Sequence, residues 1–183
     1  MPTETITTTT SDQTGDARGY WFNDAVYDWL GSLGAGAECK SWIPFTTVSL
    51  PKGARIISAT LKMYAEASSA ATTVKVKVGC EAADNPSAPT TWATLDARTL
   101  TTAYSAITLP AWTAGTQYSL DVTSAVQEIV NRAGWAAGNK IAILIQDNAG
   151  TDTHKGSSFD SATYGDPTLE IVYTTFIPQI IIF

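Results

Sequence analysis

Apolar residues recur at every second position in several short stretches of this chain, as they do in half-buried β-strands. Ile141, Ile143 and Ile145 form one such run, with smaller or polar residues between them. Glycine, proline, asparagine and aspartate separate the runs and favour turns. The pattern predicts core strands near residues 40–46, 56–66, 73–80, 105–109, 117–122, 140–147, 154–160 and 168–174.

A different spacing follows Asp-Val-Thr at residues 121–123, which is an N-cap signature for a helix. The apolar residues that recur there at helical spacing are Ala125, Val126, Ile129 and Val130. They predict one short amphipathic helix over residues 123–132, closing one end of the core. Parallel strands would need more crossover helices than this. We therefore expect an all-β fold, a jelly-roll-like antiparallel β-sandwich with one short helix.

The first 38 residues have a different character from the strands that follow. Residues 1–11 are polar and rich in threonine, and could supply either an edge strand or an extended arm. Residues 12–38 show no clear periodicity and are expected to form a long irregular loop. A loop of this length is usually functional or packed on its domain. The expected organisation is an N-terminal arm and aromatic loop (1–38), a β-sandwich domain (39–174) and a hydrophobic C-terminal tail (175–183).

The tail is uncharged and strongly apolar, so it would favour aggregation if it were left in water. It could add a strand to its own sheet, or it could pack against a neighbouring subunit by strand exchange or β-augmentation. We expect it to be a partner-binding element, with a second copy of the chain or a viral capsid protein as the partner. Its apolar residues are Phe176, Ile177, Ile180, Ile181, Ile182 and Phe183.

Several motifs occur in a consistent order: SWIPFTTVSLPKGARIISATLKMY at 41–64, DVTSAVQEIV, GWAAGN, FDS at 159–161 and the closing DPTLEIVY. In these motifs the chain resembles the DNRLRE-type β-sandwich module, which is related to carbohydrate-binding modules and occurs in bacterial surface proteins and some phage proteins. The resemblance covers roughly residues 39–174 and implies no catalytic pair. It implies a structural position for Trp135, as a plug at one end of the core. The family's usual Phe-Asp is Phe45-Thr46 here, so no role of that aspartate carries over.

Composition and charge narrow the classes of partner. A content of 44% hydrophobic residues over 183 positions suffices for one sizeable core. Eleven Lys and Arg against 17 Asp and Glu give a net charge of -6, which repels phosphate backbones. No apolar run approaches the length of a membrane span. We therefore expect neither nucleic acid nor membrane as a partner.

The start, MPTETITTTT, lacks the charged region and apolar core of a secretory signal. The protein would then act inside a cell, leave it by another route such as assembly into a virion, or have lost its signal. We expect a location on a virion or an extracellular surface.

Catalytic and metal-binding readings find little support in the sequence. The sole histidine, His154, has serines and aspartates nearby but no nucleophile elbow or HExxH spacing, and is interpreted as a surface residue. Residues 12–16, 23–28 and 147–152 carry oxygen ligands but match no EF-hand pattern. We expect no enzyme activity and no cofactor, while a structural calcium stays open. Cys39 and Cys80 are either separate buried thiols or one disulfide.

Aromatic residues supply the remaining candidate chemistry. Sugar rings stack on exposed Trp and Tyr faces, although such residues also serve in cores and interfaces. The candidate glycan-binding residues are Tyr20, Trp21, Tyr27, Trp29 and Trp92.

Two functions fit these observations. The favoured hypothesis is a non-catalytic structural or interaction protein, such as a virion surface or capsid-decorating (cement) protein, because of the adhesive tail and the missing signal. The alternative is a carbohydrate-binding module with a polysaccharide partner.

Overall fold

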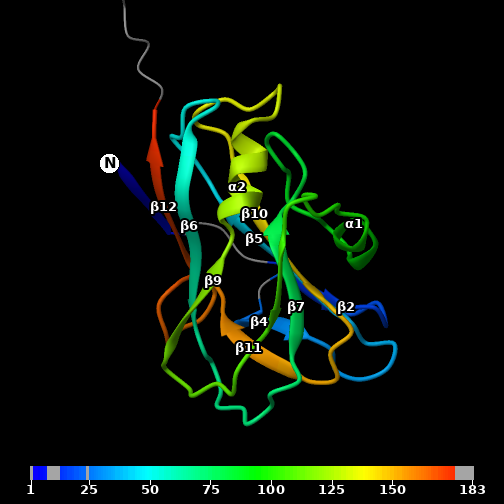
Figure 1. The fold of residues 1–183 in the computed structure, drawn as a ribbon. Coiled ribbons are helices and arrows are strands. Elements are labelled where there is room, and N and C mark those ends of the chain that lie inside the picture. Colours follow the sequence, from blue (N-terminus) through cyan, green and yellow to red (C-terminus); the bar gives the residue numbers. More distant parts are fainter. Residues whose placement is uncertain (1, 8–12, 24, 176–183) are drawn as a thin grey trace, which may run out of the picture.

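A computed structural model describes residues 2–7, 13–23 and 25–175, which form an antiparallel β-sandwich (Figure 1). A four-stranded sheet has the order β1-β12-β6-β9, and a six-stranded sheet has the order β3-β2-β5-β10-β7-β8. A separate two-stranded sheet joins β11 to β4. The strands are β1 Thr3–Thr7, β2 Gln13–Asp16, β3 Trp21–Phe22, β4 Tyr27–Gly31, β5 Cys39–Phe45, β6 Arg55–Tyr64, β7 Lys75–Cys80, β8 Ser105–Thr108, β9 Gln117–Asp121, β10 Ile141–Asp147, β11 Thr153–Ser157 and β12 Thr168–Thr174.

The predicted all-β sandwich is confirmed, and each of the expected core strands is present within a few residues of its predicted bounds. The predicted helix is α2, Thr123–Val130, and its four apolar residues are all buried. Figure 1 shows α2 at one end of the sandwich and the two-stranded sheet towards the other. Trp135 plugs the core as expected, since it is 3% exposed and its Nε1 donates to the Leu50 carbonyl at 3.0 Å.

Two expectations for the remaining segments were wrong. Residues 12–38 are not an irregular loop, because they contain β2, β3 and β4. These strands are short, and β2 (QTGD) contains no apolar side chain, so no apolar alternation marks it. A second helix, α1 (Trp92–Asp96), also interrupts the all-β pattern. It begins with a capping box in which Thr91 and Thr94 bond each other's backbone amides at 3.2 and 2.9 Å.

Strand β10 is buried on both faces, so the prediction of a half-buried strand was wrong for it. One face joins the main core between the sheets, which includes Ile143. The other face joins a second cluster made of Trp42, Leu95, Ala142 and Leu144. Leu95 and Trp92 of α1 pack into this outer cluster, and Figure 1 shows α1 alongside the six-stranded sheet. A small residue such as Ala142 within an isoleucine run therefore packs in the second cluster and does not mark a solvent-exposed face.

The two cysteines are separate buried thiols, which was one of the two open interpretations. Burial raises the pKa of the Cys39 thiol to about 12. Burial also raises the pKa of the Cys80 thiol, which lies in the main core. Thiolates are the reactive form of cysteine, so both side chains behave as small apolar residues.

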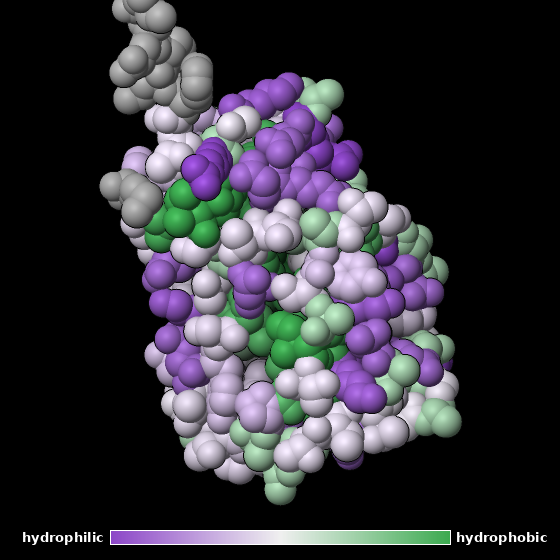
Figure 2. Space-filling view, viewed as in Figure 1, coloured by the Kyte–Doolittle hydropathy of each residue, from purple (hydrophilic) through white to green (hydrophobic). Residues whose placement is uncertain are grey.

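The surface visible in Figure 2 is mainly polar, as expected when most apolar side chains are buried in the core. Figure 2 shows that on this side the exposed side chains are mostly polar or neutral, with apolar surface confined to separate patches. Neither helix of the described residues has the length and apolar character needed to cross a membrane.

Candidate functional site

The outer face of the two-stranded sheet carries a group of aromatic rings. Along β4, Leu30 is fully buried, whereas Tyr27 and Trp29 alternate with the buried positions and are partly exposed. Their rings meet edge to face, with centroids 5.2 Å apart. Lys155 of β11 pairs with Trp29 and places its Nζ 4.2 Å from the Tyr27 ring and 4.8 Å from the Trp29 ring. Both rings therefore lie beside a cation that they attract.

Hydrogen bonds fix the backbone of Trp29 to the six-stranded sheet. Its N–H donates to Thr14 Oγ1 of β2 at 3.2 Å, and its carbonyl accepts from Ser41 Oγ of β5 at 2.9 Å. The two hydroxyls are themselves 2.9 Å apart. Because these contacts use only the backbone of Trp29, the indole ring remains available at the surface.

A tight turn places a second pair of aromatic residues next to this sheet. Asp16 N–H donates to the Tyr20 carbonyl at 3.0 Å, and Gly19 adopts a φ of +94° that favours glycine. Tyr20 is 57% exposed and Phe22 of β3 is 42% exposed. The Arg18 guanidinium lies 5.2 Å from the Tyr20 ring and 2.7 Å from Asp16 Oδ2. This hydrogen bond from Arg18 lowers the pKa of the Asp16 carboxyl.

Two neighbouring hollows lie among these rings. The first, called the apolar hollow, has a volume of about 320 Å³ and is lined by Phe22, Ala25, Val26, Tyr27 and Trp29. The second, called the charged hollow, has a volume of about 220 Å³ and is lined by Asp16, Arg18, Tyr20, Phe22, Trp29 and Leu33. Phe22 and Trp29 belong to both linings.

Exposed apolar side chains are concentrated at these hollows. Four of the six large hydrophobic side chains exposed in the described residues line them: Tyr20, Phe22, Val26 and Leu33. Ile57 and Tyr104, the other two, do not. A concentration of exposed apolar surface marks an interaction site. We call this surface, with Tyr27 and Trp29, the aromatic surface.

The structure divides the aromatic residues that the sequence singled out. Tyr20, Tyr27 and Trp29 come together at the aromatic surface. Trp21 and Trp92 instead pack against the second core cluster. Trp92 also covers Gly15 so closely that a Cβ there would lie 2.7 Å from its ring.

Sequence reasoning did not select Phe22, Val26 and Leu33 of the aromatic surface, nor the two cations beside it, Arg18 and Lys155. Phe22 was not among the candidate residues, although strand alternation opposite Trp21 could have selected it. Lys155 lies far along the chain from Trp29, and only the pairing of β11 with β4 brings it near. The apolar tail residues, Phe176 to Phe183, lie outside the described residues.

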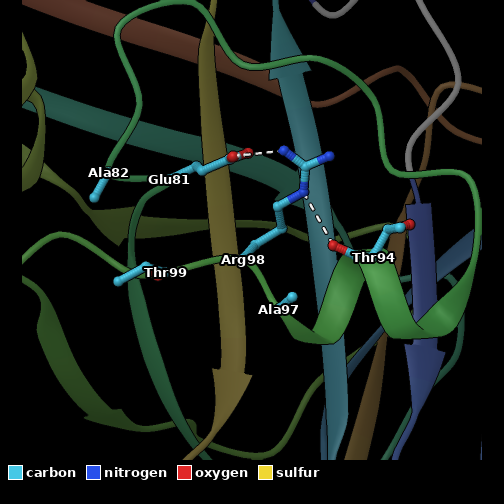
Figure 3. A pocket seen from close by; sticks show the side chains of 6 residues that line it. All are labelled: Glu81, Ala82, Thr94, Ala97, Arg98 and Thr99. Atoms are coloured by element: carbon cyan, nitrogen blue, oxygen red, sulfur yellow. Dashed lines mark hydrogen bonds and ion pairs between the residues drawn. The ribbon is translucent and has the colours of Figure 1, made fainter.

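A further hollow, of about 380 Å³, lies beside α1 and is lined by Glu81, Ala82, Thr94, Ala97, Arg98 and Thr99 (Figure 3). Glu81 Oε1 accepts from Arg98 Nη1 at 2.8 Å, and Oε2 accepts from Trp42 Nε1 at 2.6 Å. Arg98 Nε in turn donates to the Thr94 carbonyl at 3.1 Å. These bonds fasten the α1 segment to the sheet. No aromatic ring lines this hollow, so it fits a sugar less well than the aromatic surface does.

His154 is buried, so its interpretation as a surface residue was wrong. It faces inward from β11, is 1% exposed and stacks on Trp112 at 4.7 Å. Its Nε2 lies 2.9 Å from the Pro110 carbonyl, which can only accept, so this nitrogen carries a proton. Burial lowers the pKa of His154. The ring therefore serves the packing of the core.

Metal ligation finds no support among the residues that the structure describes, where no group of three or more His, Cys, Asp or Glu could hold an ion. Asp147 caps its own turn, since its carboxylate accepts from Ala149 N–H and Gly150 N–H at 3.0 and 3.1 Å. The other two candidate loops each include a position outside the described residues.

Exposed aromatic rings beside two hollows on an antiparallel sandwich form a candidate ligand-binding site. The family model of carbohydrate-binding module family 96 matches residues 25–173, and the chain belongs to this family. Families of this kind are typically non-catalytic. A search of curated proteins finds no match.

This match supports the relation to carbohydrate-binding modules that the sequence motifs implied, and it does not extend to the DNRLRE-type name or to phage proteins. It includes Tyr27, Trp29 and Lys155, while Arg18, Tyr20 and Phe22 precede it.

Proposed function

We propose that this protein is a non-catalytic module that binds carbohydrate at the aromatic surface. The observation that carries the proposal is the position of Trp29 and Tyr27, whose partly exposed rings lie beside a hollow on the two-stranded sheet. Sugar rings present C–H faces that pack on aromatic rings, and their hydroxyls accept from cationic donors. Lys155 and Arg18 supply such donors at the edges of the surface.

Family membership favours this function over the virion surface or capsid-decorating function that the sequence first suggested. Neither the family match nor the described residues point to a virion, and the tail on which that hypothesis depended lies outside them. An extracellular location, where polysaccharides are accessible, would suit the proposed function.

Retention on immobilised polysaccharides tests the proposal. The intact protein is passed over a panel of neutral and acidic polysaccharides, and we expect retention on at least one. Trp29→Ala should weaken that binding about tenfold, since an aromatic contact contributes roughly 0.5–1.5 kcal/mol beyond its buried area. Its thermal unfolding should stay close to that of the unsubstituted protein because the anchoring bonds are made by the backbone.

Tyr104→Ala is the matched control, because Tyr104 is 43% exposed and lies outside both hollows. It should bind as the unsubstituted protein does. The proposal fails if no polysaccharide is retained. It also fails if Trp29→Ala binds unchanged while a change at the stacked Tyr64–Tyr164 pair, whose centroids are 6.1 Å apart, abolishes binding.

A further inference from the structure

We infer that the aromatic surface binds at least two consecutive sugar units of an oligosaccharide or polysaccharide, one in each hollow, and not a single sugar. This inference rests on the proposed function and specifies its ligand class. The two hollows share Phe22 and Trp29 as a common wall. A ligand that fills one hollow therefore has its next unit within reach of the other.

The apolar hollow suits the C–H face of a sugar ring. Its lining contains no charged side chain and presents the rings of Tyr27, Trp29 and Phe22. Lys155 stands beside it, with its ammonium over the first two of these rings. A unit seated here would pack on aromatic carbon and leave its hydroxyls towards the cation and solvent.

The charged hollow suits the hydroxyls of the adjoining unit. In the described part of the chain, the Arg18 guanidinium donates to Asp16 through Nε at 3.2 Å and Nη2 at 2.7 Å. Nη1 is left to donate to a ligand. Asp16 is only 3% exposed and also accepts from the Arg18 amide at 2.9 Å, so it is a positioning residue that holds the guanidinium beside Tyr20.

The unequal chemistry of the hollows also favours one direction of the sugar chain, because only one end of the aromatic surface carries the Asp16–Arg18 pair. Residues 16–22 precede the part of the chain that the family model matches. Asp16, Arg18 and Tyr20 of the charged hollow thus lie outside the match, whereas Ala25, Val26, Tyr27 and Trp29 of the apolar hollow lie within it.

Titration with oligosaccharides of increasing length tests this inference. Fragments of one to four units are prepared from the polysaccharide that the protein retains, and binding is followed by calorimetry on the intact chain. Affinity should rise at least tenfold from one unit to two and change less beyond that. Tyr20→Ala should remove most of this gain, so that it weakens the binding of two units much more than the binding of one.

Arg18→Gln provides a second variant, because it removes the guanidinium donor while keeping the Tyr20 ring. It should reduce the gain from the second unit, and Tyr104→Ala should reproduce the unsubstituted profile. Equal affinity for one unit and for longer fragments overturns the inference and leaves the proposed function intact. An equal loss at every length in Tyr20→Ala also overturns it, because it indicates a single site. Absence of any polysaccharide binding overturns the inference and the proposed function together.

Discussion

Trp29 uses its two parts for different purposes. Its backbone joins the two-stranded sheet to β2 and β5, and its side chain forms the wall between the two hollows. Loss of the ring should therefore affect binding much more than folding. The ring of Trp112 instead serves the folded core, because Trp112 is 2% exposed and its ring stacks on both Tyr118 and His154. Changes at Trp112 should affect folding first.

His154 gives the fold a dependence on pH. Its pKa is lowered by burial, so the unfolded chain takes up a proton at a higher pH than the folded chain does. The contribution of neutral His154 to the free energy of unfolding is fully present above about pH 6.5, the ordinary pKa of histidine in an unfolded chain. It is lost as the pH falls towards and through the lower pKa of the folded state. We expect the melting temperature to decrease on acidification through this range.

His154→Gln supplies the comparison, because its amide can still donate to the Pro110 carbonyl but does not titrate. Thermal melts of both proteins between pH 7.5 and pH 5 measure the difference. The variant should melt lower at pH 7.5 but show a shallower pH dependence. Identical slopes would assign the acid sensitivity to other groups.

At the scale of elements, α2 closes the core at the end opposite the two-stranded sheet. The side chain of Val126 is fully buried in the core. Val126→Asp would bury an unpaired carboxylate and should lower the free energy of unfolding by several kcal/mol. Chemical denaturation measures the change.

Ser124→Asp is the matched control, since Ser124 is exposed on the first turn of the same helix. A carboxylate there interacts favourably with the helix dipole, so stability should change by no more than about 0.5 kcal/mol. Equal destabilisation of the two variants would show that the register of α2 is wrong.

The elements also show what sequence patterns can and cannot predict. The 3.6-residue spacing of α2 was sufficient because a single apolar stripe meets the core. Strand β4 was missed because it has only five residues and glycines follow it closely, although Tyr27-Asp28-Trp29-Leu30 does alternate between partly exposed and buried positions. Of the aromatic residues at the candidate site, the sequence predicted Tyr20, Tyr27 and Trp29. Their separation from Trp21 and Trp92 depends on which sheet face each residue occupies, and that required the strand pairing.

At the scale of the molecule, the described core is complete before the C-terminal tail. The last strand, β12, ends at Thr174, and its final pair joins Thr174 to Arg55. A chain that ends after Thr174 should therefore keep its thermal transition within a few degrees. The sequence-based prediction for the tail is that the same truncation reduces self-association, which sedimentation of both chains would measure. Unfolding of the truncated chain would instead make the tail a part of the sandwich.

The pairing of β4 with β11 has a kinetic consequence. Ser158 donates to the Ala25 carbonyl across 133 positions of sequence, and β11 brings Lys155 to Trp29 over a similar span. Closing so long a loop is entropically costly, and contacts of this kind form slowly. During synthesis, Tyr27 and Trp29 leave the ribosome well before β11, so their two-stranded sheet cannot form until that strand has been synthesised. Recovery of ligand affinity after dilution from denaturant should thus come later in refolding than the formation of the local α2 helix.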